Sequence, residues 1–237
     1  MIITHSNGNR RDEPVILAFD TALKHCAAAL FHDALFCNIT EEMKQGQAER
    51  LIPLLDEVLA EEGIQWSDIE LIAVGIGPGN FTGIRISVAA ARGLGLALGI
   101  PVMGVSMFEV LLDPDGPFAH PSQIASLPAP RNQAYIQHFR YGKPTADPFV
   151  LDLANLPKDL QFPINTTVIG YEAEKLCLAG HASDWRDAKA IDVAERIARK
   201  ADARWFSGET APESPSPLYV RAADAAPPRD PAPVILT

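Results

Sequence analysis

The most constraining feature of this sequence is the segment AVGIGPGNFTGIRI at residues 73–86. An apolar run ends there at a glycine-rich turn, and an alanine-rich pattern with helical spacing begins directly after it. Glycine permits backbone angles that are closed to other residues, and proline fixes one dihedral angle of the turn. The segment therefore predicts a strand, a tight loop and a helix, with Asn80 or Thr82 as the helix cap.

Two interpretations of this loop are open on sequence alone. Backbone amides at the start of a helix beneath a glycine loop form an anion site. The alternative is a tight turn with a capped helix and no ligand. The loop is neither a P-loop nor a dinucleotide fingerprint, because no Lys-Ser or Lys-Thr pair ends it and the G-x-G-x-x-G spacing is absent.

The composition predicts a soluble globular protein. The chain has 237 residues, of which 47% are hydrophobic and 21% charged, enough for one large domain or two lobes. Its formal net charge of −10 argues against independent tight binding to nucleic acid, which depends on clustered Lys and Arg. Three widely spaced cysteines without a C-x-x-C pair indicate neither a disulfide framework nor a zinc knuckle, and favour a cytoplasmic location.

The sequence predicts neither a secretory signal nor a membrane span. Residues 1–13 are polar and lack the apolar core of a signal peptide. The most apolar region, residues 87–105, is interrupted by Gly93, Gly95, Gly99 and Pro101. A buried helix followed by a strand is the expected structure there.

Apolar periodicity divides the chain into two lobes. In the first, strands are expected at residues 15–20, 27–31, 35–39, 71–76 and 101–105, with helices at 47–62, at 84–98 and from Ser106. In the second, strands are expected at 124–127, 134–139 and 167–170, and a helix at 191–203 that covers this lobe. The predicted organisation is a tail at 1–14, lobes at 15–112 and 113–211, and a proline-rich segment at 212–237.

This order of elements predicts an α/β fold with mixed sheets and helical crossovers, as in the ribonuclease H-like lobes of actin-like proteins. In actin-like ATPases an Asp at the end of the first strand lies near metal and phosphate, and Asp20 and Thr21 occupy that position here. The alternative is that both side chains only hydrogen-bond the following turn. Residues 129–135, APRNQAY, contain no glycine or carboxylate for a second phosphate hairpin, so stand-alone ATP hydrolysis is not expected.

No autonomous catalytic centre is predicted. The six histidines form no H-x-x-x-H or H-E-x-x-H pair, and no G-x-S-x-G nucleophile elbow occurs. We therefore predict no catalytic residue, no metal site and no intrinsic cofactor.

Helix surfaces are the other candidate for function. Ala91, Gly95 and Gly99 form a ladder of small residues at four-residue spacing, and Ala89, Gly93 and Ala97 form another. Small residues let a second helix approach closely, so one ladder is expected to pack on the chain's own sheet and the other to serve a partner. The apolar stripe of the helix at 47–62 is interpreted first as a face that packs in the core of this chain. The alternative is that part of it joins an intermolecular helix bundle. The candidate partner-interface residues are Leu51, Leu55, Val58, Ala91, Gly95 and Gly99.

Four segments together resemble the bacterial TsaB family, also called YeaZ: DTA at 20–22, AERLIP at 48–53, GPGNFTGIR at 77–85 and PLYVR at 217–221. The resemblance is dense over residues 15–110, sparse in the second lobe, and returns near the C-terminus. The motif residues are Asp20, Thr21, Gly77, Pro78, Gly79, Asn80, Phe81, Thr82, Gly83, Arg85, Tyr219 and Arg221.

The resemblance implies a two-lobed actin-like (ASKHA, ribonuclease H-like) fold with a mixed sheet in each lobe. It also implies a role in forming N6-threonylcarbamoyladenosine at position 37 of tRNAs that read codons beginning with A. In that family TsaB assists a catalytic TsaD-like transferase, which holds a metal, and a TsaE-like ATPase uses ATP and Mg. It further implies that tRNA is reached only through the complex, and that the first-lobe helices form the TsaD contact or a homodimer.

Three positions depart from the family pattern. Gln47 stands where many relatives have histidine, and Asn80 where serine is usual, and both replacements stay polar. The family's Asp-Ala-Arg followed by Tyr is Ala129-Pro130-Arg131 with Tyr135 here, so the aspartate is missing.

Two other functions are weighed against the scaffold. Related proteins have been classed with M22 glycoprotease-like peptidases, although the metal ligands for such chemistry are not recognisable in this sequence. An actin-like small-molecule kinase would need a complete phosphate clamp, which the sequence lacks.

Overall fold

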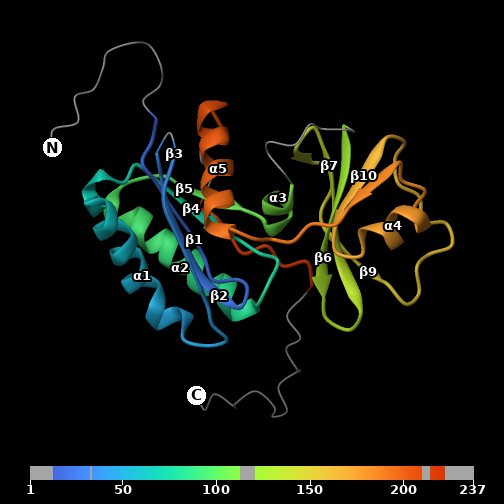
Figure 1. Ribbon diagram of the computed structural model, residues 1–237, viewed down its shortest axis with the longest axis horizontal. Helices are drawn as coiled ribbons and strands as arrows, with labels where there is room; N and C mark the ends of the chain where they lie inside the picture. Colours follow the sequence, from blue (N-terminus) through green and yellow to red (C-terminus); the bar gives the residue numbers. More distant parts are fainter. Residues whose placement is uncertain (1–12, 33, 113–120, 210–213, 222–237) are drawn as a thin grey trace, which may run out of the picture.

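In the computed structural model of the chain, residues 13–32, 34–112, 121–209 and 214–221 are described, and they form two mixed sheets (Figure 1). The first sheet has the strand order β3-β2-β1-β4-β5. β1, β2 and β3 pair antiparallel, whereas β1, β4 and β5 pair parallel, as the predicted opening and crossovers require. The strands are β1 Ile16–Asp20, β2 His25–His32, β3 Ala34–Glu42, β4 Leu71–Gly75 and β5 Val102–Val105.

Helices cover both faces of the first sheet (Figure 1). α1 (Gln47–Glu62) and α2 (Phe81–Leu98) pack on one face, which receives Leu17 and Phe19 of β1. α5 (Val193–Phe206) packs on the other face, which receives Ile16 and Ala18. Successive strand residues point to opposite faces, so β1 is buried along its whole length.

The prediction that the helix near residues 191–203 covers the second lobe is wrong. Val193, Ile197, Ala198 and Ala201 of α5 are buried in the same core as Ile16 of β1. The apolar face of the helix was recognised, but its spacing does not say which sheet it covers. The predicted lobe at 113–211 therefore ends before this helix.

The second sheet is smaller and has the order β11-β10-β6-β7-β8, with β9 also paired to β7. Its strands are β6 Ser122–Ala129, β7 Gln133–Arg140, β8 Lys143–Pro144, β9 Phe149–Asp152, β10 Thr166–Gly170 and β11 Asp184–Arg186. α4 (Ala173–Ala179) packs on one face, and α3 (Met107–Leu111) lies at the other and reaches the core beneath α5. The short elements β8, β9, β11, α4 and η1 (Trp66–Asp68) were not predicted.

The described part of the proline-rich segment, residues 214–221, packs against the first lobe and is not a separate unit. The Leu218 amide donates to the Ile76 carbonyl at 2.8 Å, and a methyl group at Gly104 would lie 3.0 Å from Cβ of Pro215. Residues 1–12, the expected lobe boundary at 113–117 and residues 222–237 lie outside the described residues.

By length and composition alone, α2 is apolar enough to cross a membrane. In the structure it packs on the first sheet with Ile84, Val88 and Ala91 buried. This agrees with the helix and strand expected in the most apolar part of the sequence.

Candidate functional site: the interlobe cleft

The glycine loop is joined to the helix that follows by hydrogen bonds within the chain. The Asn80 side chain accepts from the Gly83 amide at 2.9 Å, which confirms Asn80 as the cap of α2. The Asn80 amide donates to the Ala22 carbonyl at 2.6 Å, and the Ile84 amide donates to the Asn80 carbonyl at 2.9 Å. These bonds are those expected of a capped turn at the start of a helix.

The loop packs directly against the end of β1. A methyl group at Gly83 would lie 2.0 Å from the Thr21 carbonyl oxygen, and one at Gly79 would lie 2.4 Å from the Ala22 carbonyl oxygen. The Thr21 hydroxyl donates to the Gly83 carbonyl at 2.7 Å. The motif residues at 20–22 and 77–83 thus form one contact, which only glycine permits at two of its positions.

Asp20 bonds the following turn, as the second interpretation of this residue expected. Its Oδ1 atom accepts from the Ala22 amide at 2.9 Å and lies 2.8 Å from Nε2 of His25. The side chain is fully buried, and its Oδ2 atom has no hydrogen-bond partner and lies against Gly75. Among the described residues, no three His, Cys, Asp or Glu side chains lie close enough to hold a metal ion together.

The remaining motif residues join the C-terminal segment to the first turn of α2. The Arg85 guanidinium lies 3.7 Å above the Phe81 ring, and its Nε donates to the Tyr219 hydroxyl at 2.8 Å. The Phe81 and Tyr219 rings are 4.9 Å apart. Arg221 hydrogen-bonds Gln133 of β7, so residues 214–221 bridge the two lobes.

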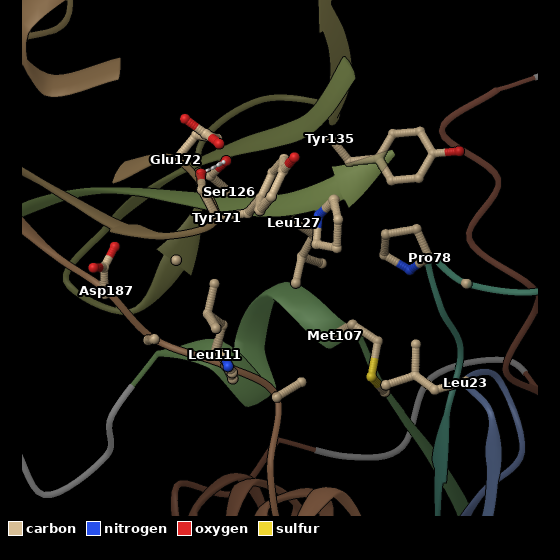
Figure 2. Close-up of a pocket in the computed structure, with 16 residues that line it drawn as sticks. Leu23, Pro78, Met107, Leu111, Ser126, Leu127, Tyr135, Tyr171, Glu172 and Asp187 are labelled. Atoms are coloured by element: carbon tan, nitrogen blue, oxygen red, sulfur yellow. Dashed lines mark hydrogen bonds between the residues drawn. The ribbon is translucent and has the colours of Figure 1, made fainter. Parts of the chain in front are cut away.

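A cavity of about 690 Å³ lies between the lobes, above the glycine loop (Figure 2). Volumes of this size are typical of sites for small ligands. Its first-lobe wall comes from the β1–β2 turn, the glycine loop and α3. Its second-lobe wall comes from β6, β7, the start of α4 and the chain entering α5. The central lining residues are Leu23, Pro78, Met107, Leu111, Leu127, Tyr135 and Tyr171.

Charged side chains in this lining are few and mostly acidic. Glu172 and Asp187 lie at the end of the cavity away from Pro78 and Leu23 (Figure 2), and Lys189 is the basic residue of the lining. None of the three forms a hydrogen bond or ion pair through its side chain with another described residue. The cavity offers one cation for a triphosphate, so it does not fit an actin-like nucleotide site.

The second-lobe segment that replaces a phosphate hairpin is a tight β turn. β6 ends at Ala129 and β7 begins at Gln133, with Arg131 and Asn132 in left-handed conformations between them. Tyr135 follows on β7 and lines the cleft, whereas Arg131 at the turn does not.

The second lobe also contains a serine–histidine contact that bears on the peptidase alternative. The Ser122 hydroxyl lies 2.7 Å from Nε2 of His138, and Thr166 Oγ1 lies 2.7 Å from the same hydroxyl. Burial, and secondarily Arg140, lowers the pKa of His138. Ser122 is buried within the sheet, so this contact is a structural network rather than an accessible nucleophile.

Five of the six predicted interface residues are internal, which corrects that prediction. Leu51, Leu55, Val58 and Ala91 are buried in the core beneath α1 and α2. A methyl group at Gly95 would lie 2.2 Å from Cγ2 of Val102, because this ladder faces β5. Gly99 is the exposed C-cap of α2. The ladder of Ala89, Gly93 and Ala97 is the exposed one.

Sequence reasoning missed the cleft residues of the second lobe. Tyr171 and Glu172 lie in the turn between β10 and α4, and Asp187 and Lys189 lie in the connection to α5. Such connecting residues carry no periodic pattern. The glycine that ends β10, Gly170, is the one local signal of a turn near the site.

Comparisons with known proteins place the chain in a family. Residues 38–204 match the family model described as TsaD, tRNA N6-adenosine threonylcarbamoyltransferase. The chain is similar to the "tRNA threonylcarbamoyladenosine biosynthesis protein TsaB" of Escherichia coli, with 38% identity over 91 residues, 38% of this chain and 39% of that protein. It is also similar to the protein of that name from Buchnera aphidicola subsp. Schizaphis graminum, with 36% identity over 97 residues, which cover 41% of this chain and 46% of that protein.

Solved structures resemble this chain over a longer part of its length than the two curated relatives do. An uncharacterized Pseudomonas aeruginosa protein, described as similar to peptidase YEAZ, superposes with a TM-score of 0.68 and 25% identity, over 88% of this chain and all of that one. YeaZ from Pseudomonas aeruginosa gives a TM-score of 0.65 and 24% identity, over 87% of this chain and 99% of that one. These likenesses bear out the predicted two-lobed actin-like fold.

The matched segments span less than half the length of the two curated relatives, whereas the family model covers most of this chain. The chain belongs to the TsaB (YeaZ) family, within the group that the threonylcarbamoyltransferase family model describes.

Proposed function

We propose that this protein is a non-catalytic subunit that supports a TsaD-like transferase in forming N6-threonylcarbamoyladenosine on tRNA. The observation that carries the proposal is membership of a family whose relatives are named for this pathway. The acidic cleft supports an assisting role over a catalytic one, since its lining has one basic side chain with which to hold a phosphate group.

The exposed face of α2 is the surface we assign to the transferase. Ala89 and Gly93 leave its middle flat, and a methyl group at Gly93 would contact no other atom within 4 Å. Leu96, one turn further along, is 87% exposed. On the neighbouring α1, Ile52 is 42% exposed. A flat strip of small residues beside exposed apolar side chains suits a partner helix.

The proposed complex divides the chemistry among its members. The metal belongs to the TsaD-like subunit, and ATP with Mg to a TsaE-like ATPase. Because this chain has a net charge of −10, tRNA is bound through the other subunits. We place the complex in the cytoplasm, and without the transferase the same helix face is available for a homodimer.

The test is modification of unmodified tRNA by the cognate TsaD-like and TsaE-like proteins, with threonylcarbamoyl adenylate supplied. Omitting this chain should abolish most of the modification. Leu96→Glu should prevent co-elution with the transferase and reduce modification to the same extent, because it places a charge on the contact face. The matched control is Leu178→Glu on α4, where the leucine is 70% exposed but lies in the other lobe.

Full modification without this chain would overturn the proposal. Peptide cleavage by the purified chain, abolished by chelation or by one side-chain change, would instead favour the peptidase alternative. Normal co-elution of the Leu96→Glu variant would leave the pathway assignment intact but move the contact to another surface.

A further inference from the structure

The interlobe cavity is a site in its own right, separate from the helix face proposed for the partner. It lies between α3 and the second sheet (Figure 2), and Ala89, Gly93 and Leu96 of α2 are not among its lining residues. Its volume of about 690 Å³ is that of a pocket for a small molecule rather than a groove for a protein.

The middle of the cavity is apolar and contains aromatic and sulfur-bearing side chains. Met107 and Leu111 of α3 form one side, and Leu127 with Tyr171 forms the other (Figure 2). Aromatic rings and thioethers pack well on flat aromatic groups. The nearby polar backbone is already paired, because the Ser126 hydroxyl donates to the Tyr171 carbonyl at 2.7 Å and the Tyr171 amide donates to the Ser126 carbonyl at 2.8 Å.

The end of the cavity away from Pro78 contains two acidic side chains that could bind a charged ligand. Glu172 and Asp187 lie there (Figure 2), and neither carboxylate bonds another described side chain. With Lys189 the lining has two acidic residues to one basic residue, on a chain whose net charge is −10. A cleft of one predominant charge with apolar walls concentrates ions of the opposite charge.

From these observations we propose that the cavity binds a small cation with a flat apolar or aromatic body, its ammonium or guanidinium group between Glu172 and Asp187. The body of the ligand lies against Met107, Leu127 and Tyr171. Phosphate-bearing ligands are disfavoured at the same site, because its lining has two carboxylates and one basic side chain. The site does not depend on assembly with a transferase.

Three probes that share one ring system separate the contributions of shape and charge. Tryptamine is cationic, indole-3-acetamide is neutral and indole-3-acetate is anionic. Binding to the full chain is measured by calorimetry, with amide shifts in the NMR spectrum locating each probe. Tryptamine should bind about tenfold more tightly than the neutral amide, since a charge-assisted hydrogen bond contributes more than a neutral one. The acetate should bind most weakly.

Two variants and a matched control assign the effect to named residues. Glu172→Gln combined with Asp187→Asn should weaken tryptamine by about tenfold and leave the neutral amide unchanged. Tyr171→Ala should weaken all three probes by a similar factor. Glu174→Gln, in the first turn of α4 but outside the lining, should change the affinity for none of the three probes.

The proposal is overturned if the three probes bind equally, if none of them saturates, or if the double carboxylate variant keeps the affinity for tryptamine. Tighter binding of MgATP than of tryptamine, with the same amides shifted, would also overturn it, because the site would then prefer a nucleotide.

Discussion

The two sheets differ in how they are covered. β1 and β4 of the first sheet are buried at every residue, because α1 and α2 lie on one face and α5 on the other. In the second sheet β10 is also buried at every residue, but β7 mixes buried with partly exposed residues, the three residues of β11 are exposed, and α4 has only seven residues. A sheet enclosed on both sides tolerates fewer changes in side-chain volume. We therefore expect substitutions in the first sheet to lower the free energy of unfolding more than substitutions in the second.

The strongest test of this difference lies at the contact between the glycine loop and β1. Gly83→Ala should lower the free energy of unfolding by about 3 kcal/mol, because the new methyl group would meet the Thr21 carbonyl at 2.0 Å. Gly93→Ala on the same helix faces open space and should raise stability by up to about 1 kcal/mol. Urea denaturation of both variants gives the two changes in the free energy of unfolding. Equal effects would mean that α2 shifts to relieve the contact.

A second test concerns α5, which comes late in the chain yet completes the first sheet. Arg204 donates to the Gly104 carbonyl at 2.8 Å and pairs with Glu109 of α3. The Glu109 carboxylate also accepts from the amide and hydroxyl of Ser106, both at 2.8 Å. Burial lowers the pKa of Arg204. Removing one member of such a pair leaves a partly buried charge without its partner.

Arg204→Met should therefore cost about 2 kcal/mol of unfolding free energy, less than for a fully buried pair. Adding Glu109→Gln should restore part of the loss, and a double-mutant cycle measures the coupling. Strict additivity of the two changes would show that α5 is held by its apolar face alone.

The enclosed sheet also explains what the sequence could predict. The runs ILAFD and LIAVG are continuous apolar segments, so β1 and β4 were predicted within a few residues, as were the helices α1 and α2. The Asn80 cap follows from local chemistry, which the sequence states directly. The backbone freedom expected of the loop glycines is used at Gly77, whose φ is 92°, whereas Gly79 and Gly83 are required by a close approach to residues distant in sequence.

The features that the sequence did not predict depend on contacts between segments that are distant in the chain. The stripe of Leu51, Leu55 and Val58 and the ladder of Ala91 and Gly95 are the same pattern whether the covering surface belongs to this chain or to another. Likewise, nothing local indicates that Glu172 and Asp187 line the same end of one cavity, since they are 15 residues apart in sequence. Their shared position is a property of the tertiary fold.

The second sheet should respond to pH through His138. Burial lowers the pKa of this histidine below its ordinary 6.5, so the unfolded chain binds more protons than the folded one as pH falls through that value. This contribution to stability is present above pH 6.5 and is lost toward pH 5. His138→Gln should flatten the fall in urea midpoint between pH 7 and pH 5, whereas His181→Asn, at an exposed position, should not. Unchanged slopes in both variants would exclude His138 as the cause.

The smallest expected effect lies at the bridge between the lobes. Tyr219→Phe removes the hydroxyl that accepts from Arg85 at 2.8 Å but keeps the ring beside Phe81, and the Leu218 amide stays bonded to Ile76. An exposed hydrogen bond contributes little, so we expect a loss of about 0.5 kcal/mol. The loss should appear as roughly twofold faster hydrogen exchange at Leu218, with Tyr141→Phe, an exposed tyrosine of the second lobe, as the unchanged control. A much larger acceleration would mean that the bridge holds the lobes together, and the two sheets would then share their stability rather than differ in it.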